Sequence, residues 1–254
     1  CLQREVVMSS IDNNELFEKY YQKEYEKFMK IEYMPEFKIQ TYKSQNCNLN
    51  VTFYEDVPII NIPYNYIKLL KSNSKPAIFH EFTHILDNHN LLQNMNPEEK
   101  EILLKWYTEY HATEVQMKAA LRFEYFNSSY MFSKSSLVHD WFKNKTVEED
   151  VLFKTNDYKT TIRSLIKSKD IYGIILHTIY YISQLNFWRQ YCKDDVGDIA
   201  DEKFVNKLIG KDSLRNLNCL FQSPTLNDVR YFNTIKMLTD RIAKEISIKI
   251  SFTK

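Results

Sequence analysis

The chain has 254 residues, with 34 Lys and Arg against 33 Asp and Glu, so its formal net charge is +1. This near-neutral balance gives no electrostatic reason to expect a nucleic-acid partner. Only three residues are glycines, and their wide spacing excludes glycine-rich nucleotide loops, the P-loop and the GxSxG nucleophile elbow. The many asparagines are therefore expected at the left-handed positions of helix ends, Asn88 and Asn90 among them.

No stretch approaches the roughly 18 apolar residues of a transmembrane helix. The four cysteines include no CxxC pair, so neither a disulfide framework nor a thiolate zinc site is expected. A cytoplasmic location is the expectation. The alternative is a lipid-anchored or secreted protein, which would follow if Cys1 were the first residue of a mature lipoprotein.

Hydrophobic periodicity predicts an α+β protein that is mostly helical. After a first helix, three short runs of alternating or β-branched residues predict a small antiparallel or mixed sheet, and the rest of the chain has helical patterns. The predicted elements are a helix over 12–31, strands over 37–41, 49–55 and 59–62, helices over 74–87 and from Asn96 to about 126, and four to six helices over 137–254, with 172–191 and 228–248 the most periodic. A Ser-rich stretch over 127–136 separates a predicted N-terminal domain, 1–130, from the all-helical region, 137–254.

The segment His80-Glu81-Phe82-Thr83-His84 is an HExxH motif within one predicted helix. Residues i and i+4 lie on the same helix face about 6 Å apart, so His80 and His84 can bind one Zn²⁺. Glu81 lies beside the first histidine, where its carboxylate reaches a zinc-bound water rather than the metal. This is the general-base position of a metalloprotease. The alternative is a helix with two core histidines and a surface glutamate.

A catalytic zinc needs a third protein ligand and an open position. The histidine extension HExxHxxGxxH is absent, because Asp87 and Asn90 occupy its glycine and third histidine positions. A glutamate on the next predicted helix is therefore expected; the candidates are Glu98, Glu99, Glu101, Glu109, Glu114 and Glu124.

Helical spacing distinguishes among these candidates. The first two are explained by capping, while Glu101 and Glu114 have a lysine four residues on and fit solvated surface pairs. Glu109 lies on an otherwise mostly apolar face, where a zinc ion would give its carboxylate a reason to be buried. A half-exposed Glu109 without a metal is the alternative.

The order of helix, short strands, HExxH helix and Glu109-Tyr110-His111-Ala112 resembles the ImmA/IrrE-type minimal gluzincin domain over roughly residues 12–126. In that family an E-x-x-A segment supplies the third zinc ligand, which implies that Glu109 has this role. The resemblance implies a zincin-like core and a regulatory protease that cuts a repressor-type protein, often of phage or mobile-element origin. The chain departs from the family in having Thr83 before the second motif histidine, where glycine is usual.

Three further residues are candidates for supporting roles. Asp87 lies on the metal face of the predicted helix, where it could hydrogen-bond a ligand histidine or simply face solvent. Tyr110 and His111 flank Glu109 and could stabilise the transition state as donors to an oxyanion, or could belong to the core and an interface.

The predicted function is a zinc metallopeptidase acting on a protein or peptide, with Glu81 activating a zinc-bound water. A strand, 49–55 or 59–62, is expected to border the cleft and to pair with an extended substrate. The alternative is a non-catalytic zinc-containing interaction or sensing protein, in which a closed site with Asp87 or His111 as fourth ligand would make the zinc structural.

Overall fold

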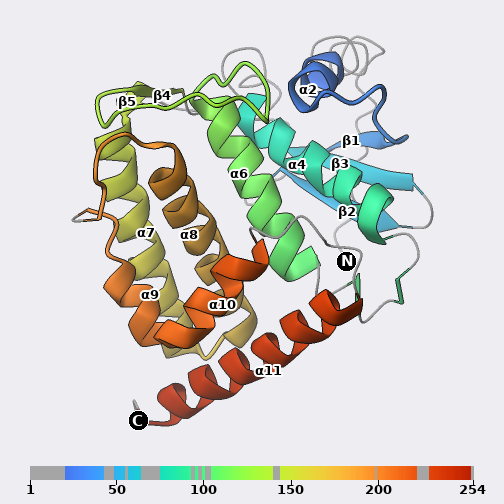
Figure 1. Ribbon diagram of the computed structural model, residues 1–254. Helices are drawn as coiled ribbons and strands as arrows, with labels where there is room; N and C mark the ends of the chain where they lie inside the picture. Colours follow the sequence, from blue (N-terminus) through green and yellow to red (C-terminus); the bar gives the residue numbers. More distant parts are fainter. Residues whose placement is uncertain are drawn as a thin grey trace. The chain divides into compact units, whose positions relative to one another are not determined.

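The structure is a computed structural model (Figure 1) that describes residues 21–42, 49–54, 57–63, 75–92, 95–96, 99–100, 104–139, 144–197, 199–221 and 229–252. Helices predominate in these segments, together with a three-stranded and a two-stranded sheet. The expectation of an α+β protein that is mostly α is confirmed at this level. Most of the first predicted helix, 12–31, lies outside the described residues; its described part is α2 (Lys23–Met29).

The described chain forms two compact units built from interleaved segments. One unit comprises residues within 1–90, 115–130 and 138–144, and the other comprises 91–114, 131–137 and 145–254. The division passes through helix α6 (Glu109–Ala120). The expected catalytic domain, 1–130, thus includes residues 91–114, which group with the C-terminal helices. In keeping with this, the Tyr110 carbonyl in the first turn of α6 accepts a hydrogen bond from Ser183.

The three predicted strands are present in the first unit, each within two residues of its expected bounds. They are β1 (Lys38–Tyr42), β2 (Asn50–Tyr54) and β3 (Val57–Pro63). The sheet is mixed, with β3 in the centre, parallel to β1 and antiparallel to β2. Since β3 already pairs on both sides, it cannot accept an extended substrate as a further strand. The expectation that strand 59–62 could pair with substrate is therefore wrong.

The HExxH residues lie on α4 (Lys75–Asp87), which occupies the predicted range and contacts β2. Helix α2 packs aromatic rings against α4, with the Tyr25 and Phe82 ring centroids 5.3 Å apart. The hydroxyl of Thr83 donates to the Phe79 carbonyl at 2.7 Å, so its oxygen is left to accept from the Tyr25 hydroxyl at 3.0 Å. A buried hydrogen bond and ring packing therefore hold α4 against α2.

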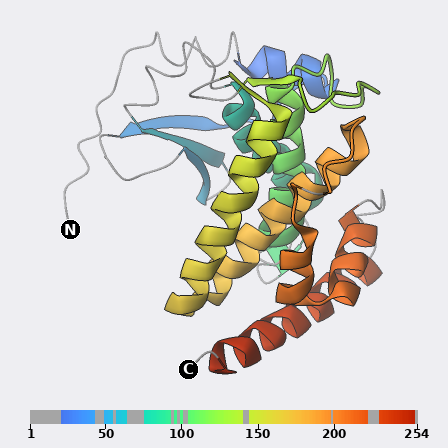
Figure 2. The ribbon, with the colours of Figure 1, turned by 90° about the vertical axis from the view of Figure 1, so that its left-hand side faces the viewer.

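Residues 145–254 of the second unit contain five described helices, in agreement with the four to six expected over 137–254. Helix α8 is apolar around most of its circumference, as expected for a helix packed on several sides. It contacts α7, α9 and α11, and it lies beside α7 along its length in both views (Figures 1 and 2). The helices are α7 (Val147–Ser168), α8 (Ile171–Tyr191), α9 (Glu202–Ile209), α10 (Lys211–Phe221) and α11 (Val229–Phe252).

The expectation of an all-helical region over 137–254 is wrong at its start. Two three-residue strands, β4 (Leu137–His139) and β5 (Asn144–Thr146), form the second sheet. Thr146 ends β5 and also begins α7, because its side chain accepts from the Glu149 backbone in a capping box. Strands this short have too little periodicity to be recognised among helical patterns.

Asparagines do not take the left-handed positions in the described part of the chain. Helix α4 continues into a π-helical segment, η2 (Asn88–Leu92), and the non-glycine residues with positive φ are Lys30, Arg122 and Lys169. The left-handed conformation costs about 1–2 kcal/mol per residue. At the two lysines this cost is offset by backbone hydrogen bonds that close the ends of α2 and α7.

The helix expected from Asn96 to about 126 ends earlier and is partly π-helical, and its residues 97–98 and 101–103 lie outside the described residues. Its predicted capping box is confirmed, because the Asn96 side chain accepts from the Glu99 backbone at 2.9 Å and the reverse bond measures 3.2 Å. A π-helical segment, η3 (Leu104–Thr108), precedes α6, which ends at Ala120.

Within the described residues, no helix is both long and apolar enough to span a membrane.

Replacing Tyr25 by Phe should lower the free energy of unfolding by about 1 kcal/mol, because the buried Thr83 oxygen loses its donor. Urea denaturation at neutral pH measures this change. The control is Tyr33→Phe at a side chain that is 68% exposed, where no change is expected. Equal stabilities of the two variants would contradict the role of the Tyr25 hydroxyl in fixing α4.

Burial of Tyr25 raises its pKa well above the ordinary value of 10.0, since a buried phenolate loses hydration. Protonated Tyr25 therefore makes its full contribution to the free energy of unfolding below about pH 10. This contribution is lost as the pH rises toward the folded-state pKa. The unfolding free energy should fall above about pH 10 by up to about 1.4 kcal/mol per pH unit for this residue. The fall should be less steep in Tyr25→Phe than in Tyr33→Phe; parallel curves would contradict the assignment.

Candidate metal centre

Helix α4 is buried on nearly every side, including at its polar residues. Phe79, Phe82 and Ile85 have no exposed surface, as expected for a helix in a protein core. Glu81 is only 8% exposed, so the alternative of a surface glutamate in the motif is wrong. Removing a carboxylate from water is unfavourable unless it has polar or charged partners. Glu81 and His84 therefore belong to a buried polar site, while His80 is partly exposed.

The two motif histidines converge on one point. The Nε2 atoms of His80 and His84 are 3.1 Å apart, and the ring centroids are 4.8 Å apart. Two nitrogens bound to one tetrahedral zinc at 2.0–2.1 Å would be separated by about 3.3 Å. The pair therefore already has nearly the spacing that a shared ion requires, on the same helix face as the sequence predicts.

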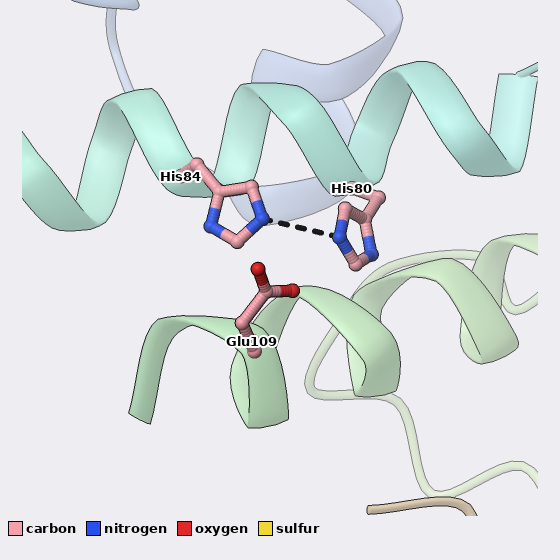
Figure 3. Close-up of side chains that lie close together, drawn as sticks. All are labelled: His80, His84 and Glu109. Carbon is pink, nitrogen blue, oxygen red and sulfur yellow. Dashed lines mark hydrogen bonds between the residues drawn. The ribbon is translucent and has the colours of Figure 1, made fainter. Parts of the chain in front are cut away.

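The Glu109 carboxylate completes a three-residue group. One ligand atom from each of His80, His84 and Glu109 lies within 4.8 Å of the other two. Figure 3 shows the two imidazoles projecting from α4 toward the carboxylate at the start of α6. Two nitrogen donors and a carboxylate oxygen match the His₂Glu set of catalytic zinc sites. These three residues could hold a metal ion.

The burial of α6 agrees with the reason for choosing Glu109. Trp106, Ala112 and Thr113, which share its predicted face, are at most 3% exposed. The Oε2 atom of Glu109 is itself buried.

Two π-helical segments, η2 directly after α4 and η3 directly before Glu109, were not predicted. Such segments are rare and occur frequently at functional sites, but no simple residue pattern marks them.

The structure describes only some of the other glutamates that were candidates for the third ligand. Glu99 caps a helix as predicted, and Glu98 and Glu101 lie outside the described residues. The expected solvated surface setting of the Glu114–Lys118 pair is wrong, because Lys118 is 2% exposed and donates to the Phe126 carbonyl at 2.9 Å. Its ammonium also lies 3.9 Å from the Phe126 ring centre. The i,i+4 spacing gives no information about which helix face is buried.

The three supporting candidates have different surroundings. Asp87 is 4% exposed and its charge contributes to the raised pKa of Tyr25, so it does not face solvent. Tyr110 is 7% exposed and stacks on Phe221, and burial raises its pKa. The half-buried His111 has its ring centre 5.7 Å from that of Tyr107.

The ligand group does not extend to a fourth protein side chain in the described part of the chain. Neither Asp87 nor His111 belongs to the group formed by the two histidines and Glu109. The closed four-ligand site that would favour a structural metal is therefore not formed by these candidates. A three-ligand set leaves one position of a tetrahedral ion for water or substrate.

Comparisons of the chain with protein-family models, curated proteins and solved structures found no match. The candidate metal centre therefore rests on its own residues and their geometry.

The intact chain should bind one Zn²⁺, and Glu109→Ala should weaken this binding by more than about 100-fold, since loss of an outer-shell partner alone costs 10–100-fold. Competition with a chromophoric chelator measures the affinity, and elemental analysis the occupancy. Glu124→Ala is the matched control, because this exposed glutamate follows α6 and is outside the ligand group. Unchanged occupancy in Glu109→Ala would show that the third ligand is wrongly assigned.

Proposed function

We propose that the chain is a zinc-dependent metallopeptidase with a zincin-like core, acting on a protein or peptide. The observation that carries this proposal is the convergence of His80, His84 and Glu109 within 4.8 Å, with Glu81 adjacent to the first histidine on the same helix. Three neutral or anionic donors can hold Zn²⁺, and a further carboxylate beside them is the arrangement that hydrolysis requires.

Each residue has a defined role in the proposed reaction. The imidazoles of His80 and His84 and the Glu109 carboxylate hold the ion. When bound, zinc would polarise the scissile carbonyl and increase the acidity of a nearby water molecule. The Glu81 carboxylate takes a proton from the attacking water and returns it to the leaving amine nitrogen, so the peptide bond breaks without net proton uptake.

The position and burial of Glu81 support this role. Helix geometry puts it about 60° around the α4 axis from His84, beside the ligand face but not on it. The residue is only 8% exposed and so is largely shielded from bulk water. A zinc that only stabilises the fold has no use for such a carboxylate. This residue therefore favours a catalytic site over a non-catalytic interaction or sensing protein.

The edge strands of the first sheet, among the strands that the structure describes, suggest how an extended substrate would bind. These edge strands are β1 and β2, and β2 contacts α4. Main-chain hydrogen bonds to a strand edge bind a peptide without regard to its side chains. We therefore propose β2, rather than β3, as the strand that pairs with substrate.

The ImmA/IrrE-type resemblance supports a more specific version of the proposal. By that resemblance the substrate would be a repressor-type protein, and the enzyme would be a cytoplasmic regulatory protease of phage or mobile-element origin. This version depends on the likeness of the motif segments and not on the geometry of the metal centre.

Glu81→Gln should retain zinc and lose peptide cleavage by about 10²–10⁴-fold, because the amide cannot accept the proton from water. The assay incubates the zinc-loaded chain with a complex peptide library and identifies new termini by mass spectrometry. Zinc occupancy is measured on the same samples.

Glu124→Gln serves as the control for a glutamate substitution and should cleave like the wild type. Full cleavage by Glu81→Gln would exclude the proposed general base. Zinc binding without cleavage by the wild type would favour the non-catalytic alternative.

A further inference from the structure

The residue that follows Glu109 is fixed by the C-terminal helices. The Tyr110 ring stacks on Phe221 of α10, with ring centres 4.2 Å apart and planes inclined by 20°. Its hydroxyl accepts from the Asn186 side chain of α8 at 3.3 Å. Asn186 also donates to the Asn218 side chain of α10 at 3.0 Å. Tyr110 is therefore held by two helices at once.

The backbone of Tyr110 is held as well. The Ser183 hydroxyl donates to the Tyr110 carbonyl oxygen at 2.8 Å. Ser183 is 1% exposed and Asn186 is 7% exposed. The two residues are three apart in α8, so they lie on one face of that helix. A single face of α8 thus binds both the main chain and the side chain of the first turn of α6.

Buried polar side chains are unfavourable unless they make hydrogen bonds, and these two make them to α6 and α10. Tyr110 and Glu109 share a peptide bond, so fixing the backbone of Tyr110 limits where the Glu109 carboxylate can lie. Metal–ligand distances tolerate only about 0.2 Å, and displaced ligands bind weakly.

We propose that Ser183 and Asn186 are positioning residues for the metal centre. They hold the first turn of α6 through Tyr110 and thereby keep Glu109 where it can bind the ion. The inference rests on the proposed metal site, and it assigns a role to the helical region after residue 137. Ser183 and Asn186 act on the metal only through Tyr110 and Glu109.

The test measures Zn²⁺ affinity of the full chain by chelator competition. It also records the visible spectrum of the Co²⁺-substituted protein, which reports ligand number and geometry. Ser183→Ala and Tyr110→Phe should each weaken Zn²⁺ binding by about 10-fold, at the lower end of the effect of outer-shell partners, and should alter the Co²⁺ spectrum. Ser183→Thr, which keeps the hydroxyl, should restore both.

Thr178→Val is the matched control on the same helix. Thr178 is 2% exposed, and its hydroxyl donates to the Ile174 carbonyl within α8 at 2.7 Å. This variant also loses one buried hydroxyl from α8, but it should bind Zn²⁺ within about two-fold of the wild type. Equal weakening in Thr178→Val and Ser183→Ala would indicate general destabilisation and overturn the inference.

The outcomes separate this inference from the proposed function. A wild-type chain that does not bind Zn²⁺ would overturn the metal site and the inference together. Wild-type binding with unchanged affinity and Co²⁺ spectrum in Ser183→Ala and Tyr110→Phe would overturn the inference alone. If Ser183→Ala does not fold by circular dichroism, Tyr110→Phe decides, because it removes one hydroxyl and retains the stacking on Phe221.

Discussion

The burial of α4 is the constraint on which the candidate site depends. Most of this helix is removed from water, including one histidine, the motif glutamate and Asp87. A polar group in such a place is unfavourable unless another group satisfies it. Tyr25 satisfies Thr83. The facing imidazoles hydrogen-bond each other at 3.1 Å, and a shared cation could bind both together with the Glu109 carboxylate.

The two ligand-bearing helices are held by separate sets of contacts. Helix α4 is fixed by α2 and by its contact with β2. The first turn of α6 is fixed by α8 and α10. On the proposed function, the sheet and α2 support the two histidines and the general base, while the C-terminal helices support the third ligand. A metal site requires this support because ligand positions tolerate only small displacements.

Local patterns predicted local structure well. The three strands and α4 lie within a few residues of their expected bounds, and the Asn96–Glu99 capping box is present. These features depend on neighbouring residues alone. The predictions that were wrong needed longer-range information. Lys118 is buried, and its ammonium contacts Phe126 beyond the end of α6, which the i,i+4 pattern does not encode. The π-helical segments were not predicted either.

The sequence by itself determined the pairing of His80 with His84 and the position of Glu81, because i,i+4 spacing on a helix leaves little freedom. It also limited the third ligand to a few glutamates and favoured Glu109. Only the tertiary structure brought that carboxylate to the histidines, since this requires two helices to meet at one register. The hydrogen bonds of Ser183 and Asn186 to Tyr110 were likewise decided by the tertiary structure, because no local pattern encodes contacts between residues so far apart in the chain.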